Sequence, residues 1–191
     1  MAMSGSYLLL PYYLQFIQGY ETMQYGVILI ANSVGMMVSG PLVGKMSDRT
    51  GNNRMFIVAG CLVCALGFFM MTEFGMDTSL LYILLALFVM GAGMGMAVVA
   101  STNLAFEYIL PGEDGQLSGI NKTYCQAGSS AGVAILNAIF MASIPAVGAL
   151  TSVSDLLPGF RHAFFVAMII SLIGFIIAMS LKDKNKEANS A

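Results

Sequence analysis

Hydrophobic residues run along this chain in long stretches, separated by short polar segments that are rich in turn residues. A helix needs about 20 mostly apolar residues to cross a bilayer. Five stretches of the chain reach this length. A further stretch, 3–18, is shorter and contains Pro11, so it predicts a first helix whose beginning is truncated. The predicted fold is therefore all-α, a six-helix membrane domain over 1–181 followed by a tail at 182–191. The five full-length stretches predict membrane-spanning helices over 25–43, 55–71, 80–106, 124–147 and 163–181.

The segments that connect these helices alternate in charge. Connections 19–24, 72–79 and 148–161 would lie on one side of the membrane, and 44–54, 108–122 and the tail on the other. Seven of the eight basic residues fall on the second side, Arg161 being the exception. Because Lys and Arg collect in cytoplasmic loops, we predict a multi-pass protein of the cell membrane with a cytoplasmic C-terminus. The seven residues are Lys45, Arg49, Arg54, Lys122, Lys182, Lys184 and Lys186.

Composition agrees with a lipid environment. Hydrophobic residues make up 58% of the chain and charged residues 9%, against about 25% charged in a soluble domain. The mean hydropathy is +0.81. The formal net charge of -2 gives no basic face, so a nucleic-acid partner is not expected. Cys61 and Cys64 form a CxxC without a second pair or a nearby histidine, which favours packing, and we expect neither a metal nor a cofactor.

The most informative motif is Gly-Lys-Met-Ser-Asp-Arg-Thr-Gly-Asn-Asn-Arg at 44–54, predicted to be a cytoplasmic loop. Gly44 would let a helix end pack against a neighbour, and Gly51 can adopt the left-handed conformation of a tight reversal. Asp48 can accept hydrogen bonds from a helix N-terminus. An ordinary basic loop would explain Arg49 and Arg54, but not the spacing of the glycines and the aspartate.

This spacing resembles the cytoplasmic-loop signature of the major facilitator superfamily, which lies between the second and third helices of a six-helix half. Further stretches are similar to the fourteen-span drug:proton antiporter branch of that family. One departure is that Asn52 and Asn53 stand where the family usually has basic residues, so we expect weaker pairing in the loop. The similar stretches are Leu14-Gln15, Gly-Ala-Gly-Met-Gly at 91–95 followed by Thr102-Asn103, Gly-Gln-Leu-Ser-Gly-Ile-Asn at 115–121, Gln126-Ala-Gly at 126–128, and Gly-Val-Ala-Ile at 132–135.

The resemblance implies a function. Such transporters consist of two six-helix halves around a central cavity, and this chain resembles the C-terminal half. Its partners would be the lipid bilayer, protons, small hydrophobic or cationic substrates, and an N-terminal half that holds most of the proton-coupling residues. Gly44, Asp48, Arg49, Gly51 and Arg54 would then form a conformational latch.

Polar residues within the apolar stretches are candidates for a substrate cavity. An amide facing lipid costs several kcal/mol, so each should face either a cavity or a hydrogen-bonding partner on another helix, and the sequence leaves both open. Small residues at Gly40/Gly44, Gly91/Gly95 and Gly128/Gly132 predict close helix contacts. The cavity candidates are Gln15, Asn32, Asn103, Gln126 and Asn137.

Two other functions stay open at this stage. Residues 128–132 match the GxSxG pattern of serine hydrolases, so Ser130 with His162 could make an intramembrane protease, provided that the two side chains meet. A six-helix chain could also be a channel subunit or an assembly partner, although we find neither a filter loop nor a charged ring. Carboxylates that could carry a proton are scarce near the predicted spans. Glu107, at the cytoplasmic boundary, is the carboxylate nearest to a span.

Overall fold

The computed structural model describes residues 2–107, 114–144 and 153–180 of the chain. The described residues form six α-helices, a π-helical segment and a short 3-10 helix, without any strand among them. This confirms the predicted all-α fold; the predicted tail at 182–191 lies outside the described residues. In chain order the elements are α1 (Ala2–Tyr12), the π-helical segment η1 (Tyr13–Ile17), α2 (Thr22–Thr50), α3 (Asn53–Thr72), α4 (Leu80–Glu107), α5 (Asp114–Ser143), the 3-10 helix η3 (Val153–Leu156) and α6 (Leu157–Ser180).

Five helices, α2 to α6, are long and apolar enough to cross a membrane, and each overlaps one predicted stretch. The helix ends differ most from the prediction in three places. Helix α2 continues to Thr50, α5 already begins at Asp114, and α6 begins at Leu157. Hydropathy marks the part of a helix that lipid can surround, whereas backbone hydrogen bonds decide where the helix ends, and polar residues can continue them into water.

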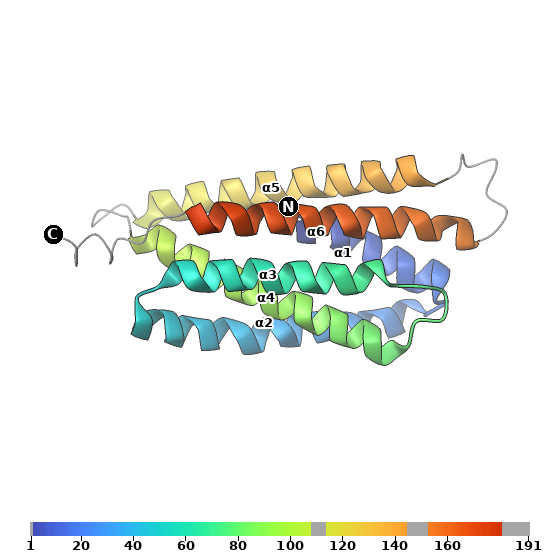
Figure 1. The fold of residues 1–191 in the computed structure, drawn as a ribbon, viewed down its shortest axis with the longest axis horizontal. Coiled ribbons are helices and arrows are strands. Elements are labelled where there is room, and N and C mark those ends of the chain that lie inside the picture. The colour runs from blue at the N-terminus through green and yellow to red at the C-terminus, as the bar shows by residue number, and fades with distance from the viewer. Residues whose placement is uncertain (1, 108–113, 145–152, 181–191) are drawn as a thin grey trace.

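The helices form an elongated bundle with two distinct ends (Figure 1). At one end α2 turns into α3 and α5 begins; we call it the basic end, because it carries Lys45, Arg49, Arg54 and Lys122. At the opposite end α3 turns into α4, and η1 leads into α2. Arg161 lies there, near the start of α6. The connections therefore alternate between the two ends as predicted for the described residues.

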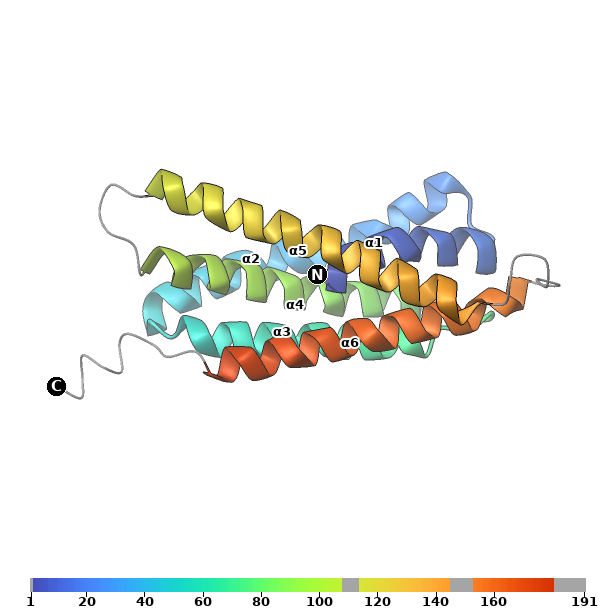
Figure 2. The same cartoon turned by 90° about the horizontal axis from the view of Figure 1, so that it is seen from above.

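Helix α4 lies between α2 and α3 and packs along both, while α3 also packs along α6. Helix α5 contacts α1 and α6 but makes few contacts with α4. Seen from above, α5 and α6 cross near the opposite end and separate toward the basic end (Figure 2). The half of α5 nearest the basic end is therefore largely uncovered, with most residues from 115 to 127 exposed.

Helix α1 begins near the middle of the bundle and runs only to the opposite end (Figures 1 and 2). It packs against α5 at Gly5, where an added Cβ would lie 2.7 Å from the carbonyl oxygen of Gly132 and 2.8 Å from Cβ of Leu136. Two residues after Pro11 the helix widens into η1, and at its end the Gln18 N–H donates to the Tyr13 carbonyl, five residues earlier, at 3.3 Å. Proline has no N–H to continue the regular ladder, so such rearrangements gather around it.

Two helices approach most closely where small residues allow it. Gly91 of α4 lies against the backbone of Asn32 in α2 so tightly that a Cβ there would overlap the Asn32 carbonyl, and a Cβ on Gly95 would lie 2.9 Å from the Met36 carbonyl oxygen. The predicted Gly91/Gly95 contact is confirmed. At Gly40 and Gly44 the helices are also in contact, but without the close backbone approach that was predicted, because a Cβ at either position would meet the Val99 side chain of α4 at ordinary distances of 3.6 and 3.9 Å.

Aromatic side chains fill the core toward the opposite end. The ring of Tyr13, fully buried, stacks on Phe74 with 5.1 Å between centroids and meets the edge of Phe160 at 5.7 Å. Phe160 in turn contacts Phe140 of α5 at 4.6 Å. These rings join η1, α5, α6 and the turn between α3 and α4, so this end of the bundle is well packed.

Candidate functional site

The predicted loop at 44–54 is mostly helix, and this corrects the sequence prediction. Residues 44–50 form the last two turns of α2, so only Gly51 and Asn52 separate α2 from α3. Gly51 has φ of 62°, and its N–H donates to the Ser47 carbonyl at 2.8 Å. The left-handed conformation predicted for Gly51 is confirmed. A residue with a Cβ strains at such an angle, so the reversal depends on this glycine.

The two asparagines that replace the expected basic residues are both used in the turn. Asn52 Oδ1 accepts from the Met55 N–H at 3.2 Å and so caps the start of α3. Asn53 is buried, and its Oδ1 accepts a hydrogen bond from the Ser47 hydroxyl. Neutral hydrogen bonds thus join the end of α2 to the start of α3 where we had expected weaker pairing.

Arg54 connects this turn to the last helix. Its guanidinium donates to the carbonyl oxygen of Met179, in the last turn of α6. The final carbonyls of a helix have no partner within the helix and attract cations. Arg49 is exposed in the last turn of α2. The side chains of Asp48 and Glu107 lie outside the described residues.

The opposite end repeats this chemistry. Arg161 of α6 donates from Nε to the carbonyl oxygen of Thr72, the last residue of α3, at 3.0 Å. Helices α3 and α6 are therefore joined at both ends by an arginine on a terminal carbonyl. Neither partner was predictable from the sequence, because any residue can supply a backbone carbonyl.

Of the five predicted cavity residues, Asn32 is held between helices. It is 2% exposed, its Oδ1 accepts from the Tyr7 hydroxyl, and its Nδ2 donates to the Leu87 carbonyl at 3.2 Å. Of the two environments that the sequence left open, Asn32 occupies the hydrogen-bonded one. Tyr7 was not singled out from the sequence, since nothing in the pattern links it to a residue 25 positions away.

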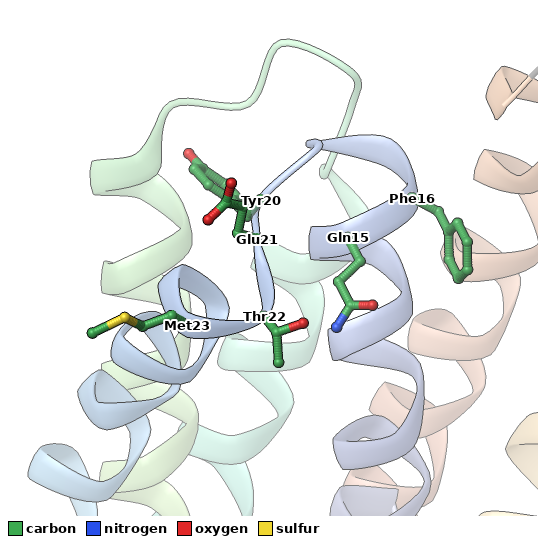
Figure 3. A pocket seen from close by; sticks show the side chains of 6 residues that line it. All are labelled: Gln15, Phe16, Tyr20, Glu21, Thr22 and Met23. Carbon is green, nitrogen blue, oxygen red and sulfur yellow. The ribbon is translucent and has the colours of Figure 1, made fainter.

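The other four candidates are spread along the bundle and are not brought together. Gln15 lies in η1 at the opposite end, where it lines a shallow pocket and its side chain points toward Thr22 (Figure 3). Asn103 is half-buried near the end of α4 at the basic end. On α5, Gln126 is exposed and Asn137 is half-buried.

The uncovered half of α5 carries a second shallow pocket. Polar and small residues alternate there with Ile120 and Tyr124, of which Tyr124 is 74% exposed. From Ser118 on, where α5 is apolar enough to cross a membrane, such a surface is unsuited to lipid alone, because hydroxyl and amide groups such as those of Thr123 and Gln126 would face hydrocarbon. This surface is a candidate for contact with another protein segment or with a water-filled cavity. The pocket is lined by Gly115, Gln116, Gly119, Ile120, Thr123 and Tyr124.

The geometry excludes the serine-hydrolase alternative. Ser130 lies inside the continuous helix α5, where its hydroxyl donates to the Gln126 carbonyl at 3.1 Å, and not at a strand-to-helix elbow. The contact between Phe140 and Phe160 fixes how α5 and α6 align. Ser130 precedes Phe140 by ten residues, and His162 follows Phe160 by two. At about 1.5 Å per residue the two side chains start roughly 12 Å apart along the bundle axis.

Comparison with known sequences finds one family model and several related proteins. A sequence model of the Major Facilitator Superfamily matches residues 1–133. The chain is 27% identical over 190 residues to "Uncharacterized MFS-type transporter YcnB" of Bacillus subtilis, covering 96% of this chain and 39% of that protein. It is 32% identical over 143 residues to "Multidrug resistance protein B homolog" of Mycobacterium tuberculosis, covering 73% of this chain and 26% of the relative.

A third relative is "Puromycin resistance protein pur8" of Streptomyces alboniger. It is 29% identical over 194 residues, which cover 96% of this chain and 38% of that protein. The chain thus spans between 26% and 39% of the length of these relatives.

Proposed function

The chain belongs to the major facilitator superfamily, and we propose that it forms the C-terminal six-helix half of a multidrug efflux transporter that exchanges hydrophobic or cationic compounds for protons. The observation that carries this proposal is the similarity over 96% of the chain to a protein named for puromycin resistance. The multidrug resistance protein B homolog supports the same substrate class. Assignment to the fourteen-span branch rests on the resemblance of residues 91–95 and 115–121 to that branch.

The proposed orientation places the basic end in the cytoplasm. Four described basic residues lie at this end and one, Arg161, at the other. Basic residues in short loops are retained on the cytoplasmic side during insertion. The turn at Gly51 would then face the cytoplasm, and the pocket beside Gln15 would face the outside.

The proposed partner is an N-terminal transporter half. The uncovered part of α5, with exposed Gln116, Thr123 and Gln126, supports a protein or cavity surface there. The relatives are more than twice as long as the aligned part. Both observations agree with a transporter in which α5 faces a second group of helices across a central cavity.

In this proposal the turn between α2 and α3 acts as a latch. Gly51 allows the reversal, Asn53 joins α2 to α3, and Arg54 joins α3 to α6. Since these three helices are thereby linked at one end, they should move as a unit when the two halves rock against each other. Asp48 and Arg49 would form the part of the latch that contacts the partner half.

The experiment is proton-driven transport in lipid vesicles with a fluorescent lipophilic cation as substrate. Vesicles would contain the chain alone, or the chain together with the polypeptide encoded directly upstream in the same reading frame. We expect movement against a gradient only with both polypeptides, and its loss when a protonophore collapses the proton gradient. Movement that persists without the gradient would contradict proton coupling, and movement by the chain alone would contradict the need for a second half.

A further inference from the structure

Glycines lock α4 against both of its neighbours. A Cβ added to Gly35 of α2 would overlap the carbonyl oxygen of Phe88 in α4, and one added to Gly60 of α3 would lie 2.6 Å from the backbone nitrogen of Ala97. Backbones that approach so closely leave no room for one helix to tilt against the other. Helices α2, α3 and α4 therefore form one rigid unit.

Helix α6 is joined to this unit at both ends. At the basic end Arg54 of α3 donates to the Met179 carbonyl of α6. At the opposite end Arg161 of α6 donates to the Thr72 carbonyl of α3 at 3.0 Å, and the two helices pack along each other between these bonds. A bond at each end opposes both sliding and separation, so α6 moves with α3. We call α2, α3, α4 and α6 together the base.

Helix α5 is held differently, because its packing is confined to one half. Among the residues whose side chains the structure describes, α5 is buried only at Gly132, Leu136 and Phe140. The ring of Phe140 contacts Phe160 of α6 with 4.6 Å between centroids. Most residues from 115 to 127 are exposed, and α5 diverges from α6 toward the basic end (Figure 2). Helix α5 is thus fixed at one end and free at the other.

Helix α1 connects α5 to the base. It packs on α5 and α6 but makes few contacts with α2, α3 or α4. Its Gly5 lies against α5, where an added Cβ would be 2.7 Å from the Gly132 carbonyl oxygen. Two residues later, the Tyr7 hydroxyl donates to Oδ1 of Asn32 in α2. Among the described residues this is the one side-chain hydrogen bond between α1 and the base.

This bond can be broken at low cost. Tyr7 is 40% exposed, so water can replace Asn32 as the partner of its hydroxyl, and hydrogen bonds between membrane helices average only about 0.6 kcal/mol. The glycine and arginine contacts of the base have no such exchangeable partner. The Tyr7–Asn32 bond is therefore the weakest restraint on the position of α1 and, through Gly5, on that of α5.

The contacts of α5 are arranged as in a lever. Gly132 precedes Phe140 by eight residues and Cys125 precedes it by fifteen. At about 1.5 Å per residue, these positions lie roughly 12 and 22 Å from the Phe140 contact. A displacement of α1 at Gly132 is therefore roughly doubled at Cys125.

From this geometry we infer that α5 is a hinged arm, which pivots at the contact between Phe140 and Phe160 and is restrained by the hydrogen bond between Tyr7 and Asn32. While the bond is made, α1 holds α5 at one distance from the base. When it breaks, α1 and α5 move together, and residues 115–127 take up further positions. The inference does not rest on the proposed function, because every contact it uses lies within the chain.

The test measures the distance between two spin labels by double electron–electron resonance, on the 191-residue chain in lipid nanodiscs. One label is attached to Cys125, which is exposed on the free half of α5, and the other to Met55→Cys at the exposed start of α3. Cys61 and Cys64 are replaced by alanine throughout. We expect Tyr7→Phe to raise the population outside the main distance about threefold, the effect of losing one average hydrogen bond between membrane helices.

Two controls separate movement of the arm from general loosening. Tyr12→Phe removes a hydroxyl from the same helix that bonds no other described residue, and it should leave the distances unchanged. Labels at Met23→Cys and Met55→Cys, combined with Cys125→Ser, measure the base alone, and their distance should not respond to Tyr7→Phe. Circular dichroism verifies that each variant is folded.

Equal distributions for the Cys125 pair in the unchanged chain and in Tyr7→Phe would overturn the inference, because the bond would then not restrain α5. Equal broadening of the pair within the base would also overturn it, since the whole bundle would then have loosened. Phe140→Leu removes the ring contact of the pivot and should broaden the distribution for the Cys125 pair; no change there would remove Phe140 as the pivot. The measurement needs no transport, so it and the transport assay can fail independently.

Discussion

Tyr7 donates its phenolic hydrogen to the side-chain oxygen of Asn32, 25 residues later in the chain. The Asn32 amide donates in turn to the Leu87 carbonyl at 3.2 Å, so one side chain joins α1, α2 and α4. Asn32 is 2% exposed and Tyr7 is 40% exposed. The aromatic ring is therefore held at a fixed orientation on the open side of α1 by a partner buried behind it.

Loss of this hydrogen bond should loosen α1. We expect Tyr7→Phe to lower the free energy of unfolding by about 0.6 kcal/mol, the average for hydrogen bonds between membrane helices, and by no more than about 1.7 kcal/mol. The measurement is denaturant unfolding of the chain in detergent micelles. In a double-mutant cycle with Asn32→Leu, the two effects should not add, because both changes remove the same contact. Additive effects would show that the two side chains act separately.

The closest helix contact predicts a size limit at Gly91. Gly91→Ala would drive a methyl group into the Asn32 backbone, and overpacking of this kind costs about 1–3 kcal/mol. Gly40→Ala is the matched control, since the new methyl would lie 3.6 Å from Val99. We expect the control to be neutral or stabilising by up to about 1 kcal/mol. The same unfolding measurement would contradict this packing if both variants were equally stable.

The left-handed turn predicts a graded response at Gly51. Gly51→Val should destabilise the chain by about 1–2 kcal/mol because of its φ of 62°, which a β-branched residue tolerates poorly. Gly51→Asn should retain most of the stability, since asparagine adopts this conformation more readily. Thermal unfolding of both variants distinguishes a conformational requirement from a loss of small size, which would affect the two alike.

The arginine bonds predict that α3 and α6 separate at their ends when either is lost. Arg161→Leu removes the bond to the Thr72 carbonyl and should cost about 0.5–1.5 kcal/mol. Lys122→Leu, at an exposed position of α5, is the control and should change stability by less than about 0.5 kcal/mol. Hydrogen exchange of the last turn of α3 should rise in the first variant alone.

The proposed latch predicts a separation of transport from binding. In the complete transporter, Asp48→Asn should lower the transport rate by more than about tenfold while the substrate Kd changes less than about threefold, because the residue would bias a conformational equilibrium. Transport in vesicles and equilibrium binding provide the two numbers. An unchanged rate would remove Asp48 from the latch.

The sequence alone determined the fold class, the number of helices and the family resemblance. Long apolar stretches determine these because lipid requires every backbone group to be bonded within its own helix, so each stretch must become one helix regardless of its neighbours. The conformation of Gly51 was predictable for a similar reason, since a reversal between two helices is a local event. The same local reasoning ended α2 too early and began α5 too late, because hydropathy carries no information about the polar residues that continue α2 to Thr50 and start α5 at Asp114.

Only the tertiary structure decided how the polar residues are used. Asn32 faces Tyr7 and Leu87 rather than a cavity, and Gly91 rather than Gly40 marks the tightest contact. Glu21 shares a pocket with Gln15 because Gly19 folds η1 back against α2. These outcomes depend on how the helices are rotated and aligned with one another, and that is set by the packing of all six together and not by the spacing of residues within any one of them.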